Sequence, residues 1–247
     1  MILTIAHKEF RSLFATPSTW LILGTLQFIF AWFFLARLDA FLQVQAQLAQ
    51  IGNAPGATLS VAVPLFGTLA IILMMLIPVF TMRLLAEERR NHTLVLLMTS
   101  PVSTGEIVLG KFVGLMLLLL LVVTSCFLMV MSLAAGTQLD MGLLLSNTLG
   151  VLLLASSYAA LGLYISSLTS QPVVAAITSL AALFGLWLIE ISAVDNDNAL
   201  HLFTPTSHFQ NFNIGLLNSA DLVYFLAFLA TFLLLTIRRV NNNRIYG

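Results

Sequence analysis

One stretch of the sequence comes close to a nucleotide-binding motif, and it is the strongest candidate for catalysis. Residues 105–112 (GEIVLGKF) match the glycine-rich phosphate-binding loop up to Lys111. Phe112 then stands where the motif needs a Ser or Thr hydroxyl for magnesium. A long apolar run follows, where the motif requires a soluble helix. We therefore expect the chain to bind no nucleotide and to have no catalytic residue of its own.

The other polar side chains also lack the spacing of a catalytic or metal site. The four histidines are scattered, without metal-ligand spacing, and no Ser, His and Asp have a spacing that suggests a triad. Residues 195–198 (DNDN) lack the glycine and the distal glutamate of a calcium loop, which favours a solvated turn. Glu190 is expected at the end of a membrane span, as an interfacial carboxylate. No metal ion or cofactor is expected in this chain.

The charged residues concentrate instead in residues 83–110, between two strongly apolar runs. Ser103 and Glu106 have the spacing of a capping box, so a helix is expected to begin at about Thr104 and to run through Lys111. A second, short helix is expected over residues 94–98, between a cap before it and a proline after it. Such a helix, held between two membrane helices, fits either a groove on a partner or the lipid surface.

The composition of the whole chain indicates which kind of structure holds residues 83–110. Only 8% of the chain is charged and 60% is hydrophobic, against about a quarter charged in soluble domains. The sequence therefore predicts an all-α integral membrane protein, with 1–247 as a single transmembrane domain and no sizeable soluble part. The expected spans are 18–36, 61–82, 111–133, 143–165, 173–191 and 221–237, with residues 83–110 as a loop between the second and third.

An amphipathic helix is expected before the first span, over residues 2–15. Its apolar positions recur at three- and four-residue spacing, and its polar residues take the other face. The apolar face comprises Leu3, Ala6, Phe10, Leu13 and Phe14, and the polar face His7, Lys8, Glu9 and Arg11. Such a helix lies as an elbow in the headgroup layer. A signal-peptide origin is disfavoured because the next apolar run is too long and no clear cleavage site follows it.

Three further features concern the spans. After the first span the glutamines of residues 41–51 alternate like a strand, but the apolar spacing favours a helical extension. Pro78, in the second span, should kink the helix and free the carbonyl of Met74, which either faces a pathway or has no role. The fourth span is rich in small residues, which allow close helix contact. The inner turn after it is expected over residues 166–172.

The cations give the orientation. Under the six-span layout nine of the ten Lys and Arg residues fall on one side, and only Arg37 falls on the other. The nine are Lys8, Arg11, Arg83, Arg89, Arg90, Lys111, Arg238, Arg239 and Arg244. By the positive-inside rule, both termini and residues 83–110 are predicted to be cytoplasmic. The zero net charge gives no indication of nucleic-acid binding.

Residues 82–112 (MRLLAEERRNHTLVLLMTSPVSTGEIVLGKF) resemble the cytoplasmic loop of type-2 ABC exporter permeases. The likeness is strongest to the gliding-motility-associated permeases and to the permease of nitrous-oxide-reductase maturation. The loop of that family has a pair of acids, a Gly-Thr, an apolar stretch ending near a proline, and a Gly-Lys-aromatic sequence. The matching residues here are Glu87, Glu88, Thr93, Leu94, Leu96, Leu97, Pro101 and Gly110 to Phe112. His92 stands where the family often has glycine.

The resemblance implies a permease with an elbow helix and six spans, which pairs with a second copy or a paralogue. Two ABC ATPase subunits would hold ATP and magnesium, and the short helix 94–98 would sit in their groove as a coupling helix. The lipid bilayer of a bacterial inner membrane would surround it, and an anchored protein with a periplasmic domain would be a further partner. The expected function is ATP-driven export. The alternative is mechanotransmission, which passes ATPase motion to an envelope partner without a substrate. An ion-coupled carrier is disfavoured because no buried acids are expected.

Overall fold

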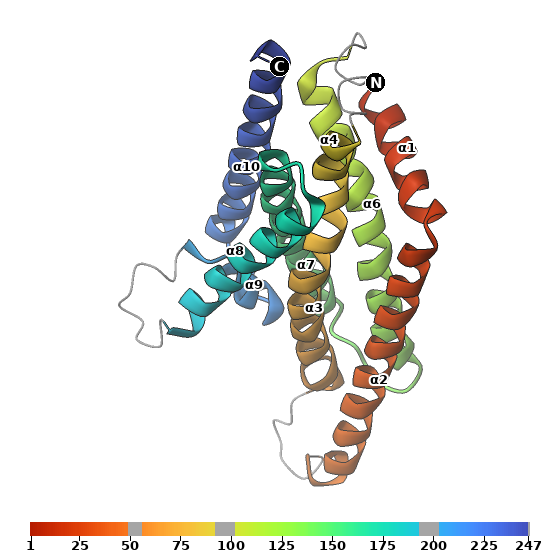
Figure 1. Ribbon diagram of the computed structural model, residues 1–247. Helices are drawn as coiled ribbons and strands as arrows, with labels where there is room; N and C mark the ends of the chain where they lie inside the picture. The colour runs from red at the N-terminus through yellow and green to blue at the C-terminus, as the bar shows by residue number, and fades with distance from the viewer. Residues whose placement is uncertain (49–55, 92–101, 193–202, 247) are drawn as a thin grey trace.

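The computed structural model of the protein describes residues 1–48, 56–91, 102–192 and 203–246. In these ranges the chain forms helices and turns and no strand (Figure 1). Among the described residues six helical segments are long and apolar enough to cross a membrane. They contain α2 (Pro17–Leu48), α3 (Val63–Met82), α6 (Thr104–Met131), α7 (Met141–Leu168), α8 (Pro172–Ser192) and α10 (Ser219–Tyr246). The chain is thus an all-α, multi-pass membrane protein.

Several helices are longer than the apolar runs alone suggest. The glutamine-rich segment after the first span is helical, because α2 continues to Leu48. A π-helical turn, Thr58–Ala62, precedes α3, and a 3-10 turn, Ser132–Ala135, follows α6. The expected inner turn over 166–172 is wrong in part, since α7 continues through Leu168. Ser166 and Ser167 are therefore helical, and their side chains are held in the last turn of α7.

Helix α7 lies at the centre of the bundle. Of its most apolar stretch 72% is buried, against 17% for α2 and for α8. Its small residues permit this packing: a Cβ added at Gly162 would lie 2.5 Å from Oγ1 of Thr81 on α3. A Cβ at Gly150 would lie 2.5 Å from Cβ of Phe212. The close contact that the small residues of the fourth span predict is therefore present.

The N-terminal helix α1 (Ile2–Ala15) packs against the first half of α6 through two glycines. A Cβ added at Gly110 would lie 2.7 Å from Cβ of Ile5, and one at Gly114 would lie 2.8 Å from Cβ of Glu9. Gly110 and Gly114 form a G-x-x-x-G pair, which lets two helix backbones approach closely. The approach brings the polar side chain of Glu9 against α6.

The buried stripe of α1 differs from the predicted one. Its buried residues are Ala6, Glu9 and Leu13, whereas Leu3 is 79% exposed. Placing Glu9 on the polar face was therefore wrong. Glu9 has the same three- and four-residue spacing from its two buried neighbours as any core residue, and its charge has a partner on α6. Periodicity on one helix could not reveal that partner.

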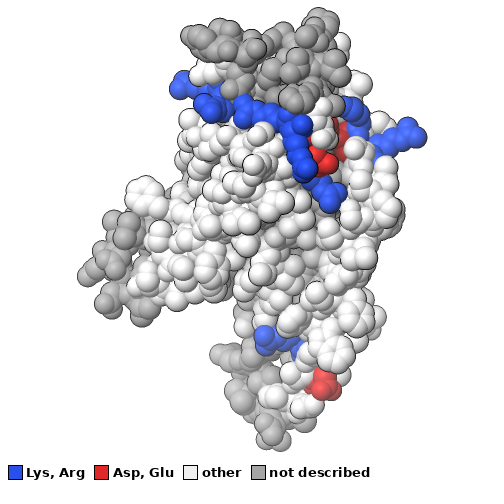
Figure 2. All heavy atoms as spheres, in the orientation of Figure 1, with Lys and Arg blue, Asp and Glu red and all other residues white. Residues whose placement is uncertain are grey.

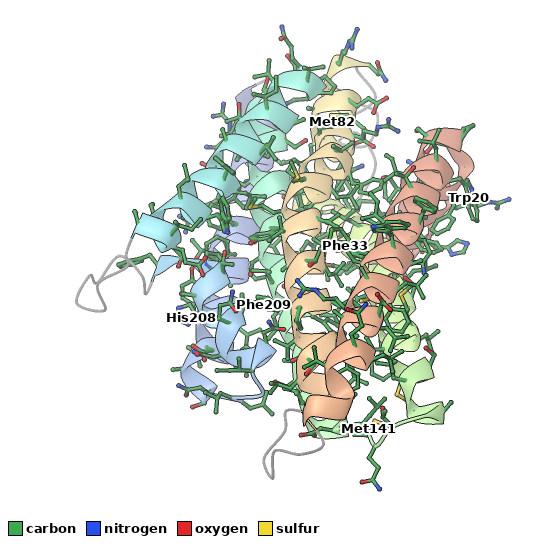
Figure 3. All side chains as sticks on the ribbon, turned by 90° about the horizontal axis from the view of Figure 1, so that it is seen from below. Trp20, Phe33, Met82, Met141, His208 and Phe209 are labelled. Atoms are coloured by element: carbon green, nitrogen blue, oxygen red, sulfur yellow. The ribbon has the colours of Figure 1, made fainter. Side chains whose placement is uncertain are left out.

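A short helix, α9 (Pro205–Asn213), covers α7 at the end of the bundle away from the chain termini. Phe209 and Phe212 are buried in the core, and Oγ of Ser146 on α7 donates to the carbonyl of Phe212 at 2.8 Å. His208 contacts Asp221 at the start of α10. Figure 3 shows Phe209 within the bundle and Trp20 at its outer edge. Helix α9 therefore covers the core near the N-terminal end of α7.

Charged side chains gather at the end of the bundle that carries the termini. Both termini and α4 (Glu88–Arg90) lie at the same end in Figure 1. Figure 2 shows most Lys and Arg around this end, with acidic residues among them, then a broad uncharged surface and a few charged side chains at the opposite end. This distribution follows the charge asymmetry of the sequence.

Candidate functional site

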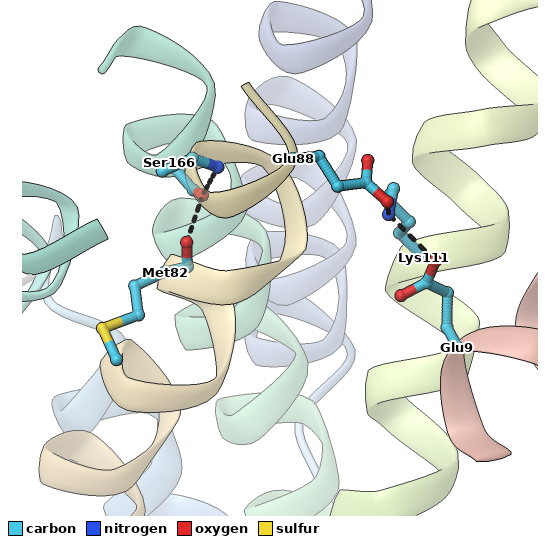
Figure 4. Close-up of polar contacts among 6 residues, drawn as sticks. Glu9, Met82, Glu88, Lys111 and Ser166 are labelled. Carbon is cyan, nitrogen blue, oxygen red and sulfur yellow. Dashed lines mark hydrogen bonds and ion pairs between the residues drawn. The ribbon is translucent and has the colours of Figure 1, made fainter. Parts of the chain in front are cut away.

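A buried lysine joins three helical segments at the charged end. Nζ of Lys111 on α6 lies 2.9 Å from Oε1 of Glu9 on α1 and 2.6 Å from Oε1 of Glu88 on α4 (Figure 4). The Lys111 side chain is 1% exposed, and those of Glu9 and Glu88 are 11% and 17% exposed. We call Lys111, Glu9 and Glu88 the charged triad. It connects the N-terminal helix with both helices that flank residues 92–101.

The start of α6 is fixed by its capping box. Oγ of Ser103 accepts a hydrogen bond from the backbone N–H of Glu106 at 3.2 Å. Oε2 of Glu106 in turn accepts one from the backbone N–H of Ser103 at 3.1 Å. These two bonds satisfy backbone donors that the first helical turn leaves without partners. The helix therefore enters the bundle in a defined direction two turns before Lys111.

A π-helical turn, Arg83–Glu87, follows α3 and continues into α4, which carries Glu88 of the charged triad. A π-helical turn disturbs the regular backbone ladder and often occurs at functional sites. Oγ of Ser166 on α7 accepts from the N–H of Ala86 at 3.0 Å and donates to the carbonyl of Met82 at 3.4 Å (Figure 4). The altered turn is thus held by the end of α7.

A second contact attaches α4 to the same end of α7. Nη1 of Arg89 donates to the carbonyl of Ser167 at 2.9 Å. Carbonyls in the last turn of a helix lack intrahelical partners and carry partial negative charge, so a guanidinium is favoured there. Glu88 and Arg89 therefore connect α4 to α6 and to α7, in two directions.

These contacts attach α1, α4, α6 and α7 to one another at the charged end. A buried ion pair adds little net stability but becomes costly when one partner is removed. The two ion pairs therefore favour the arrangement in which Lys111, Glu9 and Glu88 stay in contact. Within the described ranges no three His, Cys, Asp or Glu side chains are grouped so that they could hold a metal ion.

The predicted coupling residues fall into two groups. Thr93, Leu94, Leu96, Leu97 and Pro101, with the expected short helix 94–98, lie outside the described residues. Glu87, Glu88, Ser103 and Glu106 are described and flank that segment on both sides. Glu88 belongs to the charged triad, while Glu87 is partly exposed and lines a neighbouring cavity.

Sequence reasoning missed the contacts of Glu9 and Ser166, and it gave Lys111 no ion-pair partner. Two signals were available. Gly110 and Gly114 have G-x-x-x-G spacing at the start of an apolar run, which indicates a close helix contact. Lys111 also directly precedes 28 residues without charge, 112–139, where an unpaired cation would be costly. The identity of its partners required the tertiary structure.

The bundle defines a class: a multi-pass membrane protein whose buried lysine joins three helical segments at one end, without a metal cluster among the described residues. The family model described as ABC-2 family transporter protein matches residues 3–242. The chain therefore belongs to the ABC-2 transporter permease family. Permeases of this family are membrane subunits of transporters and not their catalytic subunits, and membership implies an ABC ATPase partner. None of the curated proteins compared with the chain matches it.

Proposed function

We propose that the chain is the permease subunit of an exporter and that ATP hydrolysis on a separate ABC ATPase drives it through residues 83–110. The observation that carries the proposal is the charged triad, because it couples both helices flanking residues 92–101 to α1. A displacement of that segment would move α4 and α6 together. ATP and magnesium would be bound by two ATPase copies, and a second permease copy or a paralogue would complete the transporter.

The proposed side of the membrane follows from charge. The Lys and Arg residues gather at the end with the termini and α4 (Figure 2), and cytoplasmic ends of membrane helices carry such an excess. We infer that this end faces the cytoplasm of a bacterium, where the ATPase has access to ATP. Outward transport then means movement toward the end that carries α9.

Mechanotransmission stays as the second candidate because one helix connects the two ends. Ser166 and Ser167, at one end of α7, hold the π-helical turn and Arg89. Ser146 and Gly150, near the other end, contact Phe212 of α9. A shift of α4 would therefore reach α9 through a single rigid element. In this variant the moving outer helix would act on a membrane-anchored partner with a periplasmic domain.

ATPase stimulation in proteoliposomes tests the proposal. The permease is reconstituted with the ABC ATPase that co-purifies with it, and ATP hydrolysis is compared with that of the ATPase alone. Two variants should abolish the stimulation while the protein stays inserted. Leu96→Asp adds a charge to the expected apolar docking face, and Glu87→Ala/Glu88→Ala removes the expected acidic pair. Leu216→Asp, at an exposed position at the opposite end, is the matched control and should keep it. Undiminished stimulation by Leu96→Asp would contradict the coupling role.

A further inference from the structure

A polar cavity of about 220 Å³ lies beside the charged triad, between α1 and the segment from Arg83 to Asn91. Its wall contains Lys8, Glu9, Arg83, Glu87 and Glu88. Typical pockets for small molecules have about 300–1,000 Å³, so this cavity has room for a small polar group only. Its charges are its distinguishing feature.

Both signs of charge are present in equal number. The lining holds two cations and three carboxylates, and Lys111 directly behind Glu9 and Glu88 adds the third cation. Lys111 forms ion pairs with two of these carboxylates, Glu9 and Glu88. Lys8, Arg83 and Glu87 form no ion pair with any other described residue. Nη1 of Arg83 donates to Oγ of Ser18 at 3.3 Å, and the other N–H groups of the guanidinium stay available. Two cations and one carboxylate without an ion pair to a described residue therefore line the cavity.

The surroundings indicate where such a ligand comes from. On the face seen in Figure 2, the charged end borders on a broad surface without Lys, Arg, Asp or Glu, which separates it from a few charged side chains at the opposite end. The charged end of a membrane bundle lies at the level of the lipid headgroups, and the uncharged surface lies at the level of the acyl chains. A molecule with a charged head and apolar chains matches both surfaces at once.

We propose that this cavity binds the headgroup of a zwitterionic phospholipid with a primary ammonium, that is, phosphatidylethanolamine. Arg83 and Lys8 bind the phosphate, Glu87 accepts hydrogen bonds from the ammonium, and the acyl chains stay outside on the uncharged surface. Guanidinium and phosphate form strong charge-assisted hydrogen bonds. A quaternary ammonium has no N–H to donate to Glu87, so phosphatidylcholine binds more weakly. Phosphatidylglycerol offers the same phosphate but no ammonium, so it leaves Glu87 without a donor and also binds more weakly.

Native mass spectrometry of the intact protein, titrated in detergent with defined phospholipids, tests this assignment without the ATPase. Phosphatidylethanolamine should bind with about tenfold higher affinity than phosphatidylcholine or phosphatidylglycerol, as expected from the loss of one charge-assisted hydrogen bond. Glu87→Gln should remove this preference. Arg83→Gln should instead weaken the binding of all three lipids, because each of them carries the phosphate. Both side chains are only partly buried, so both variants are expected to fold.

Matched controls are available at the other end of the bundle. Arg37→Gln and Asp39→Asn remove one cation and one carboxylate from exposed positions and should leave the preference unchanged. Equal affinity for the three lipids, a preference that survives Glu87→Gln, or undiminished binding of all three lipids to Arg83→Gln would overturn the proposal. Displacement of the lipid by soluble glycerophosphoethanolamine would contradict the assignment to a membrane lipid. Because ATP hydrolysis is not measured, these outcomes are independent of the proposed coupling function.

Discussion

At the scale of single residues, Lys111 is the most informative side chain. A lysine in a nearly uncharged helix is costly unless its charge has partners. The structure supplies two, one on each neighbouring segment, at 2.9 and 2.6 Å. The sequence marked Lys111 and Glu88 as motif residues but offered no reason to place Glu9 beside them. That reason lies in contacts between residues about a hundred positions apart.

Replacing the cation should expose the cost of this arrangement. Lys111→Met leaves two carboxylates facing each other in a largely buried place, and it should destabilise the protein by at least about 2 kcal/mol. This is below the ~3–5 kcal/mol for a fully buried pair because both carboxylates keep some contact with solvent. Reversible unfolding in mixed micelles measures the loss.

Two further variants show whether charge is the cause. Arg238→Met removes an exposed cation from the same end and should change stability by less than about 0.5 kcal/mol. The triple variant Lys111→Met/Glu9→Gln/Glu88→Gln should recover most of the stability, since replacing a whole buried ion cluster is often tolerated. A Lys111→Met protein as stable as Arg238→Met would show that the charged triad does not hold these helices.

At the scale of elements, the sequence predicted the helices well and their mutual contacts poorly. The capping box of Ser103 and Glu106 and the helical continuation after the first span both follow from local pattern, and both are present. The π-helical turn at Arg83–Glu87 and its support by Ser166 do not, because they depend on a residue about eighty positions away. The face that α1 buries was predicted wrongly at Glu9 for the same reason.

The close contact of α1 with α6 should depend on the absence of a side chain at Gly114. Gly114→Ala would place a Cβ 2.8 Å from Cβ of Glu9 and 3.0 Å from the carbonyl oxygen of Ala6. Because one of these atoms is backbone, α1 must move away. The free energy of unfolding should fall by about 1–3 kcal/mol, the usual cost of overpacking. Reversible unfolding in mixed micelles measures this loss.

Another helical glycine provides the control. A Cβ added at Gly185 in α8 would have no atom of another residue within 4 Å, and Ala is favoured over Gly inside a helix by about 0.5–1 kcal/mol. Gly185→Ala should therefore be neutral or slightly stabilising. If Gly114→Ala behaved in the same way, α1 would not be closely packed on α6.

At the scale of the whole molecule, the order of charges along the chain predicted the layout. The described residues contain six helices suited to a membrane, and the cations gather at one end (Figure 2). Composition and length were sufficient for this result, because the bilayer restricts the available architectures to a few. Which helix occupies the centre was not predictable from hydropathy. The central place of α7 follows from its small residues.

Reporter fusions test the orientation. Alkaline phosphatase fused after Ile51 should be active, because that position is predicted to be periplasmic. A green fluorescent protein fused after Gly247 should fluoresce, because the C-terminus is predicted to be cytoplasmic. An inactive phosphatase after Ile51 together with a non-fluorescent fusion after Gly247 would reverse the positive-inside assignment and remove the ATPase from the charged end.

Photo-crosslinking in cells is the decisive test of the coupling role of residues 83–110. A benzophenone amino acid is placed at Leu96, and the crosslinked products are identified by mass spectrometry, with the same amino acid at Leu216 as the control. We expect a crosslink from position 96 to an ABC ATPase and none from position 216. Crosslinks from position 96 only to lipid, in cells that contain the ATPase, would contradict the coupling role.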